Sequence, residues 1–299
     1  MRSPIDVGGT PVAVTVSGGT VWVADQAGGK VVRIDPRRRR RIGRPVVLGE
    51  APVAIAGGSG AVWVAGADGA VRSLDARTGR IEGQPVRLPG ATGIAVGAGA
   101  VWVTDGGAGT VTRIDPATRR PDPPLRVGAG PADVVVAEDA VWVANGGDGT
   151  VSRVDPDTGA VAAPIETGGS RVLALASGEG ALWVARAKGR FGDRIDVVRL
   201  DPATGELDER SVAVKGGTPL DLAAGEGGVW ATDVGGVRPP GPKLVAGTVT
   251  RIDPGEAAVV GRPLPVGDRP TAVAVGEGGV WVANAADGTL TPITLAAGG

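Results

Sequence analysis

Short runs of alternating apolar and polar residues recur along this chain, and turn-forming residues separate them. The run VVRIDP at 31–36 returns as VTRIDP at 111–116, VSRVDP at 151–156, VVRLDP at 197–202 and VTRIDP at 249–254. Alternation with period 2 is typical of β-strands that bury one face. The Asp-Pro at the end of each run favours a turn, because Pro cannot donate to a continuing ladder. The pattern therefore predicts an all-β chain.

A second motif places a Trp in an aliphatic strand seven times, at positions 22, 63, 102, 142, 183, 230 and 281. Successive Trp residues lie 41, 39, 40, 41, 47 and 51 positions apart, which is the period of four-stranded propeller blades. Gly-rich stretches precede the Trp strands and are expected to be hairpin turns. All seven Trp share one repeat position, so we expect them to pack neighbouring blades together rather than to form a ligand cage.

The two ends of the chain complement each other. The opening PIDVGGTP at 4–11 matches LPVGDRP at 264–270, and the last unit supplies only three strands. We therefore predict a seven-bladed β-propeller of four-stranded antiparallel blades, in which the N-terminal strand closes the seventh blade. The whole chain, 1–299, is expected to be one monomeric domain, with blade 7 formed by about 271–299 plus 1–9.

Missing residue types restrict the chemistry further. The chain contains no His, no Cys and no Tyr, which excludes Ser-His and Cys-His nucleophile pairs, thiolate or His-based metal sites and a Tyr nucleophile. No phosphate-binding loop pattern is present, so neither a cofactor nor a metal is expected. The formal net charge of −1 does not indicate a nucleic-acid-binding surface, and no apolar stretch has the length of a membrane span.

The repeat stretches in two places, both between a Trp and the Asp that ends the third strand. The spacing is 12 or 13 in the first four blades, 18 from Trp183 to Asp201 and 23 from Trp230 to Asp253. Both inserts join second to third strands, on the face that also carries the blade-to-blade connections, here named the upper face. Their basic and aromatic residues are expected to form a groove for an anionic ligand or a protein or peptide partner. These residues are Arg186, Lys188, Arg190, Phe191, Arg194, Arg238 and Lys243. The alternative is that the inserts pack on themselves and the charges are solvated.

Two acidic residues interrupt a ring of small ones in the first strands. Nine positions before each Trp the chain has Ala13, Ala54, Gly93, Asp133, Ala174, Asp221 and Ala272. First strands line the channel of a propeller, so Asp133 and Asp221 are expected near its upper mouth. They are candidates to bind a cation or a basic ligand group. The alternatives are ion pairs with Arg171 and Arg269, or hydrogen bonds to backbone N–H groups.

A basic run, Arg37 to Arg41, lies in the turn between the third and fourth strands of blade 1, on the opposite, lower face. Five like charges in sequence can bind phosphate or an anionic surface. A single exposed turn more often stays solvated, and we expect that outcome here.

The unit VWVAN-GGDGT-VSRVDP-DTG resembles the YVTN and NHL-like β-propeller repeats of bacterial proteins, over essentially the whole chain. Propellers of this type form extracytoplasmic sensor domains of actinobacterial Ser/Thr kinases, and one branch is the virginiamycin B lyases. The resemblance to the lyase branch implies a catalytic His with a bound metal, and this chain has no His. The resemblance therefore implies a binding module without catalysis, and a fold alone does not fix a function.

The sequence favours a non-catalytic propeller that binds a ligand or partner on its upper face, as a sensor or interaction domain of a bacterial protein. One alternative is a structural or engineered ring without a specific ligand. Another is an enzyme, either a lyase-like one that lacks the family His or one that uses Asp133 and Asp221. The expected compartment is extracytoplasmic or secreted if the chain is part of a sensor protein, and cytoplasmic otherwise.

Overall fold

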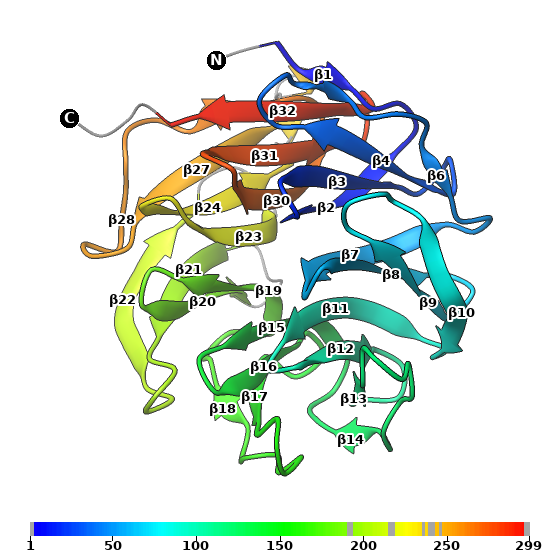
Figure 1. The fold of residues 1–299 in the computed structure, drawn as a ribbon. Coiled ribbons are helices and arrows are strands. Elements are labelled where there is room, and N and C mark those ends of the chain that lie inside the picture. Colours follow the sequence, from blue (N-terminus) through cyan, green and yellow to red (C-terminus); the bar gives the residue numbers. More distant parts are fainter. Residues whose placement is uncertain are drawn as a thin grey trace.

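Seven antiparallel sheets stand around a central axis in the computed structural model (Figure 1). The structure describes residues 3–189, 194–214, 219–234, 237–238, 243–244 and 247–295, and none of these is helical. The predicted fold class is confirmed: the chain is an all-β, seven-bladed β-propeller of four-stranded antiparallel blades.

Within each blade the strands follow one another from the channel to the rim. The inner strands are β2 (Pro11–Ser17), β7 (Pro52–Gly58), β11 (Ala91–Gly97), β15 (Pro131–Ala137), β19 (Arg171–Gly178), β23 (Pro219–Gly225) and β30 (Pro270–Gly276). The second strands, which hold the Trp residues, are β3 (Thr20–Asp25), β8 (Ala61–Gly66), β12 (Ala100–Asp105), β16 (Ala140–Asn145), β20 (Ala181–Lys188), β24 (Gly228–Asp233) and β31 (Gly279–Asn284). The third strands are β4 (Lys30–Asp35), β9 (Ala70–Asp75), β13 (Thr110–Ile114), β17 (Thr150–Val154), β21 (Arg194–Leu200), β27 (Thr248–Asp253) and β32 (Thr289–Thr294).

The fourth strand is broken into short pieces in four blades. It is continuous as β10 (Ile81–Arg87) and β22 (Leu207–Ala213) in blades 2 and 5. Elsewhere it is broken into the two-residue pieces β5 (Arg40–Arg41), β6 (Val46–Val47), β14 (Leu125–Arg126), β18 (Ile165–Glu166), β28 (Ala258–Val259) and β29 (Leu264–Pro265). Although the continuous β10 also contains a Pro, a Pro without an N–H donor stands directly before four of the short pieces. These residues are Pro45, Pro124, Pro164 and Pro263. The breaks shorten the exposed outer edges, which lowers the tendency to pair with other chains.

Ring closure follows the prediction for the N-terminus. The strand β1 (Ile5–Asp6) pairs with β32 as the outer strand of blade 7, with Ile5 opposite Leu290. Val7 is fully buried in the cluster that contains Trp281. The two described ends of the chain thus contribute to one sheet, as Figure 1 shows at the meeting of the blue and red strands.

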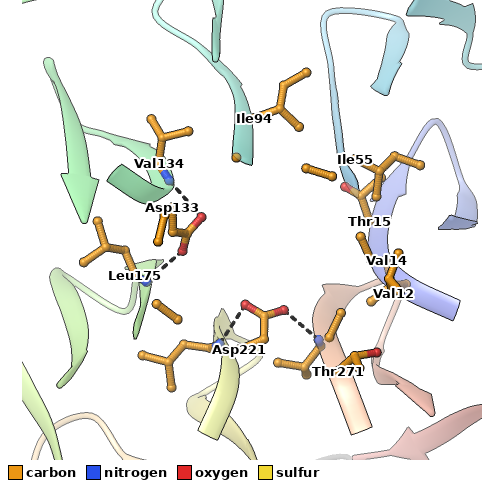
Figure 2. Close-up of a pocket in the computed structure, with 18 of the residues that line it drawn as sticks. Val12, Val14, Thr15, Ile55, Ile94, Asp133, Val134, Leu175, Asp221 and Thr271 are labelled. Carbon is orange, nitrogen blue, oxygen red and sulfur yellow. Dashed lines mark hydrogen bonds between the residues drawn. The ribbon is translucent and has the colours of Figure 1, made fainter. Parts of the chain in front are cut away.

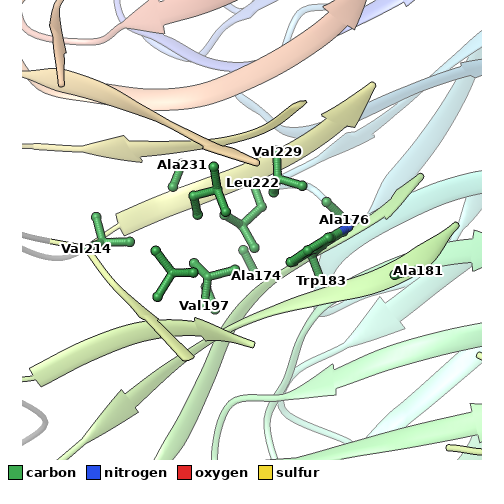
Figure 3. Packing of buried hydrophobic residues seen from close by; sticks show 12 residues of the cluster. Ala174, Ala176, Ala181, Trp183, Val197, Val214, Leu222, Val229 and Ala231 are labelled. Carbon is green, nitrogen blue, oxygen red and sulfur yellow. The ribbon is translucent and has the colours of Figure 1, made fainter. Parts of the chain in front are cut away.

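Each Trp anchors a core between two consecutive blades, as predicted. Trp183 of blade 5 packs with Leu222, Val229 and Ile252 of blade 6 (Figure 3). The other six Trp take the same place in the remaining six clusters, and all seven side chains are at most 3% exposed. Burial of a Trp removes roughly 150–250 Å² from water, so these side chains hold the blades in a ring.

The inner strands share one register, and this register determines what faces the channel. In blade 1 a two-residue turn at Gly18 and Gly19, both with positive φ (58° and 73°), joins β2 to β3. The pair that closes such a turn is hydrogen-bonded, and bonded and non-bonded pairs then alternate along the ladder. A β-bulge near the start of the inner strand recurs in all seven blades.

Candidate functional site

A cavity of ≈ 380 Å³ occupies the central channel, and the inner strands of all seven blades line it (Figure 2). At the ring position nine residues before each Trp, the wall has Ala or Gly in five blades. Small side chains leave the channel open at this level. Asp133 on β15 and Asp221 on β23 are the two exceptions, and both line the cavity as predicted.

The β-bulge places each Asp side chain against backbone N–H groups. Oδ1 of Asp133 accepts a hydrogen bond from the N–H of Val134 at 2.8 Å, and Oδ2 accepts one from Leu175 at 2.8 Å. Val134 is the next residue in blade 4, whereas Leu175 belongs to β19 of blade 5. The carboxylate therefore bridges two neighbouring inner strands, and charge-assisted bonds of this kind are stronger than neutral ones.

Asp221 makes the same arrangement two blades further on. Its Oδ1 accepts from the N–H of Leu222 at 2.9 Å, and its Oδ2 accepts from Val273 on β30 of blade 7 at 2.9 Å. No ion pair involves either carboxylate in the described part of the chain, so the pairing with Arg171 and Arg269 is not present there. Of the two alternatives to ligand binding, the structure has the bonds to backbone N–H groups.

The electrostatics of the two carboxyl groups differ from those of an ordinary Asp. Burial raises the pKa of Asp133 to about 6, although the N–H donors of Leu175 and Val134 lower it. Burial and, to a lesser extent, the negative charge of Asp133 together raise the pKa of Asp221 to about 8, although the N–H donors of Val273 and Leu222 lower it. The two groups therefore titrate as a coupled pair that retains a proton near neutral pH. A cationic group in the channel would relieve this repulsion.

The two inserts of the upper face are hairpin extensions. In blade 5, β20 and β21 stay paired out to Lys188 opposite Arg194. In blade 6 the short strands β25 (Val237–Arg238) and β26 (Lys243–Leu244) pair with each other, with Arg238 opposite Lys243. The predicted residues Arg190 and Phe191 lie outside the described residues, as do the side chains of Arg194, Arg238 and Lys243.

The two basic side chains of this set that the structure describes converge on one carboxylate. Arg186 is 7% exposed, donates from Nε to Oδ1 of Asp196 at 2.7 Å and also donates to the carbonyl oxygen of Thr167. Nζ of Lys188 lies 3.2 Å from Oδ2 of Asp196. Burial raises the pKa of Asp196, but the hydrogen bond and charge of Arg186 outweigh it, and the net shift is downward. A role of the inserts in binding an anion stays a prediction.

The basic run of blade 1 is partly neutralised. Nη1 of Arg38 lies 2.9 Å from Oδ2 of Asp35, and Nη2 of Arg41 lies 3.3 Å from Oδ2 of Asp6. These pairs are solvent-exposed and contribute little to stability.

Backbone N–H groups were predicted as possible partners of the two carboxylates, but the sequence did not identify which N–H groups these are. The direction of a backbone N–H group depends on the strand register and cannot be seen from residue types. The available signal was the row of Ala and Gly at one ring position, which Asp133 and Asp221 interrupt.

Metal and membrane candidates are also limited. Among the described residues, no group of three or more His, Cys, Asp or Glu side chains is placed to hold a metal ion. No helix in the described part is long and apolar enough to cross a membrane.

Comparison with solved structures relates this architecture to several proteins of different activity. Virginiamycin B lyase from Staphylococcus aureus matches with a TM-score of 0.80 and 18% identity, over 98% of this chain and 99% of the lyase chain. Hydrazine synthase from Kuenenia stuttgartiensis matches with a TM-score of 0.81 and 16% identity, over 100% and 99% of the two chains. The Pan2 WD40 domain of Neurospora crassa matches with a TM-score of 0.71 and 13% identity, over 96% and 92%.

These matches share the fold. At such identities they carry no activity over to this chain, because propellers with one architecture serve unrelated functions. No protein-family model matches the sequence. No curated protein matches it either. The comparisons therefore show a propeller fold and leave the activity of this chain open.

Proposed function

We propose that this protein is a non-catalytic binding module that takes a small ligand into the mouth of its central channel, where Asp133 and Asp221 receive a positively charged group. The observation that supports this most directly is the presence of two carboxylates in one cavity with no cationic side chain paired to either in the described chain. Buried carboxylates are costly unless their charge is compensated.

The chemistry of the chain favours binding over catalysis. With no His, Cys or Tyr in the chain, the channel has no Ser-His or Cys-His nucleophile pair. Both carboxylates are already oriented by two N–H donors each, which suits a fixed recognition site. The resemblance to sensor propellers fits a role as a sensor or interaction domain of a larger bacterial protein.

The basic inserts are the second candidate, for an anionic ligand or a peptide partner. This possibility has less support from the described side chains, because Arg186 and Lys188 both contact Asp196 and their charge is partly used within the insert. A scaffold without any small ligand is the third candidate.

Calorimetric titration with small cations, such as n-butylammonium and methylguanidinium, tests the channel proposal. The variants Asp133→Ala and Asp221→Ala install the residue that four other blades have at this position, so the ring is expected to fold. Each should weaken binding by at least about tenfold. Glu277→Ala is the matched control, since it removes one exposed carboxylate from a hairpin turn away from the cavity.

Three outcomes separate the candidates. Binding that is equal in the Asp variants and in Glu277→Ala would overturn the channel site. Binding of anions that disappears when residues 187–194 are deleted would favour the insert site. No binding of any probe would favour a scaffold.

A further inference from the structure

The two halves of the channel wall differ in chemistry. The carboxylates of Asp133 and Asp221 take up the inward N–H groups of four consecutive blades, 4 to 7, which belong to Val134, Leu175, Leu222 and Val273. The corresponding residues of blades 1 to 3 are Val14, Ile55 and Ile94, and all three line the same cavity. Figure 2 shows these three across the cavity from the two carboxylates.

The register shows where the N–H groups of blades 1 to 3 point. In blade 1 the hydrogen-bonded pairs are Ser17 with Thr20, Thr15 with Trp22 and Ala13 with Ala24, counted from the two-residue turn. Val14, opposite Val23, is a non-bonded position, so its N–H points away from β3. Because β2 is the edge strand at the channel, that direction is into the channel.

The same count applies to blades 2 and 3. Ile55 lies opposite Val64 and Ile94 opposite Val103, two registers that match Val134 opposite Val143. In blade 4 this N–H does point inward, since it donates to Asp133. In blades 1 to 3 the neighbouring residue is Ala13, Ala54 or Gly93, which has no acceptor, and no side chain of the described chain accepts from Val14, Ile55 or Ile94.

Three inward N–H groups on adjacent strands can donate hydrogen bonds to an anion. Backbone N–H groups that converge on one concavity bind carboxylate and phosphate oxygens, and a buried donor without a partner costs free energy. A free anion would still be repelled by Asp133 and Asp221. An anionic group that is covalently linked to a cationic one satisfies both halves of the wall at once.

We propose that the channel recognises a small zwitterion, of the amino-acid or short-peptide class, with its ammonium at Asp133 and Asp221 and its carboxylate at two adjacent N–H groups of the set Val14, Ile55 and Ile94. This inference rests on the proposed function, to which it adds the second contact and the orientation of the ligand. The five small residues of the ring leave room for the ligand backbone between the two ends.

The test uses the intact protein and a series of ω-amino acids from 3-aminopropanoate to 6-aminohexanoate in calorimetric titration. Each is compared with the alkylamine and the carboxylate of the same chain length. One amino acid should bind at least about tenfold more tightly than its matched amine, and the carboxylate alone should bind weakest. The length optimum reports the span between the two halves.

The outcomes distinguish this inference from the proposed function. If the amines bind as tightly as the amino acids and the Asp variants abolish both, the cation site stands and the zwitterion is refuted. If none of the compounds binds, both proposals are refuted.

The variant Ala54→Asp tests the anionic end directly. It copies onto blade 2 the arrangement that Asp133 has on blade 4, and its carboxylate should take up the N–H groups of Ile55 and Ile94. We expect the advantage of the amino acid over the amine to disappear while the amine itself is still bound. An advantage that survives in a correctly folded Ala54→Asp protein would refute the inference, and Ala54→Ser serves as the matched control for side-chain volume.

Discussion

Ionisation of Asp221 should make the folded protein less stable as the pH rises, and Asp221→Ala should remove this dependence. The pKa of Asp221 in the folded protein is about 8, against an ordinary value of 3.8 for an Asp side chain. Between these values the folded protein holds a proton that the unfolded chain releases. Stability is therefore greatest below the unfolded pKa and is lost as the pH rises through the folded one. One such proton changes the free energy of unfolding by about 1.4 kcal/mol per pH unit well below the folded pKa, and by roughly 2 kcal/mol in total between pH 6 and 8, where the group becomes half ionised.

The chain is well suited to this measurement, because it has no His and no Cys to titrate in the same range. Denaturant unfolding followed by Trp fluorescence, at one-unit steps from pH 5 to 9, gives the free energy of unfolding for each protein. The difference between the wild type and Asp221→Ala should shift in favour of the variant as the pH rises. Asp133→Ala should show a weaker effect and also lower the pKa of Asp221, since it removes a negative charge. Parallel curves from pH 5 to 9 would refute the assigned burial and charge coupling.

Three further predictions concern stability and use the same unfolding assay. Arg186→Ala should lower the free energy of unfolding by about 3–5 kcal/mol, since it leaves the carboxylate of Asp196 without its closest partner. Lys188→Ala should lower it by less than about 1 kcal/mol, because Lys188 is the more exposed of the two partners of Asp196. Equal losses in the two variants would contradict this prediction. Trp142→Ala should cost about 3–5 kcal/mol because the side chain is fully buried between blades 4 and 5; a loss below about 1 kcal/mol would count against the packing role. Val7→Ala should cost roughly 2 kcal/mol if β1 closes the ring, and an unchanged midpoint would argue against closure.

The architecture was predictable because every blade solves the same packing problem with the same residues. Trp22 and Trp183 lie 161 positions apart, yet each fills the gap to the next blade. The outer strands were predicted less well. The repeat predicts one outer strand per blade, whereas only a two-residue piece follows Pro45 in blade 1 and Pro164 in blade 4, where the Pro has no N–H to donate to the ladder.

The candidate site was predictable only where it breaks the repeat. Asp133 and Asp221 were identifiable as carboxylates in a ring of small residues, but their partners in the next blade depend on the β-bulge and on the distance between inner strands. The charge of Arg186 was identifiable as well. Its burial beside Asp196 was not, because the pairing needs the hairpin register of β20 and β21.

The position of the two carboxylates in the ring has a consequence for any ligand. An Asp on one blade takes up the N–H groups of its own blade and the next, so carboxylates on blades 4 and 6 satisfy blades 4 to 7 without overlap. Blades 1 to 3 are then the only continuous arc left with inward donors and no acceptor in the described wall. At Gly93 an added Cβ would lie 3.0 Å from Oγ1 of Thr104, so a longer side chain at this position is disfavoured. A strict sevenfold repeat would line the channel with the same groups in every blade. The two Asp residues in place of small ones make one side of the described channel wall negatively charged and leave unpaired inward N–H donors on the other side.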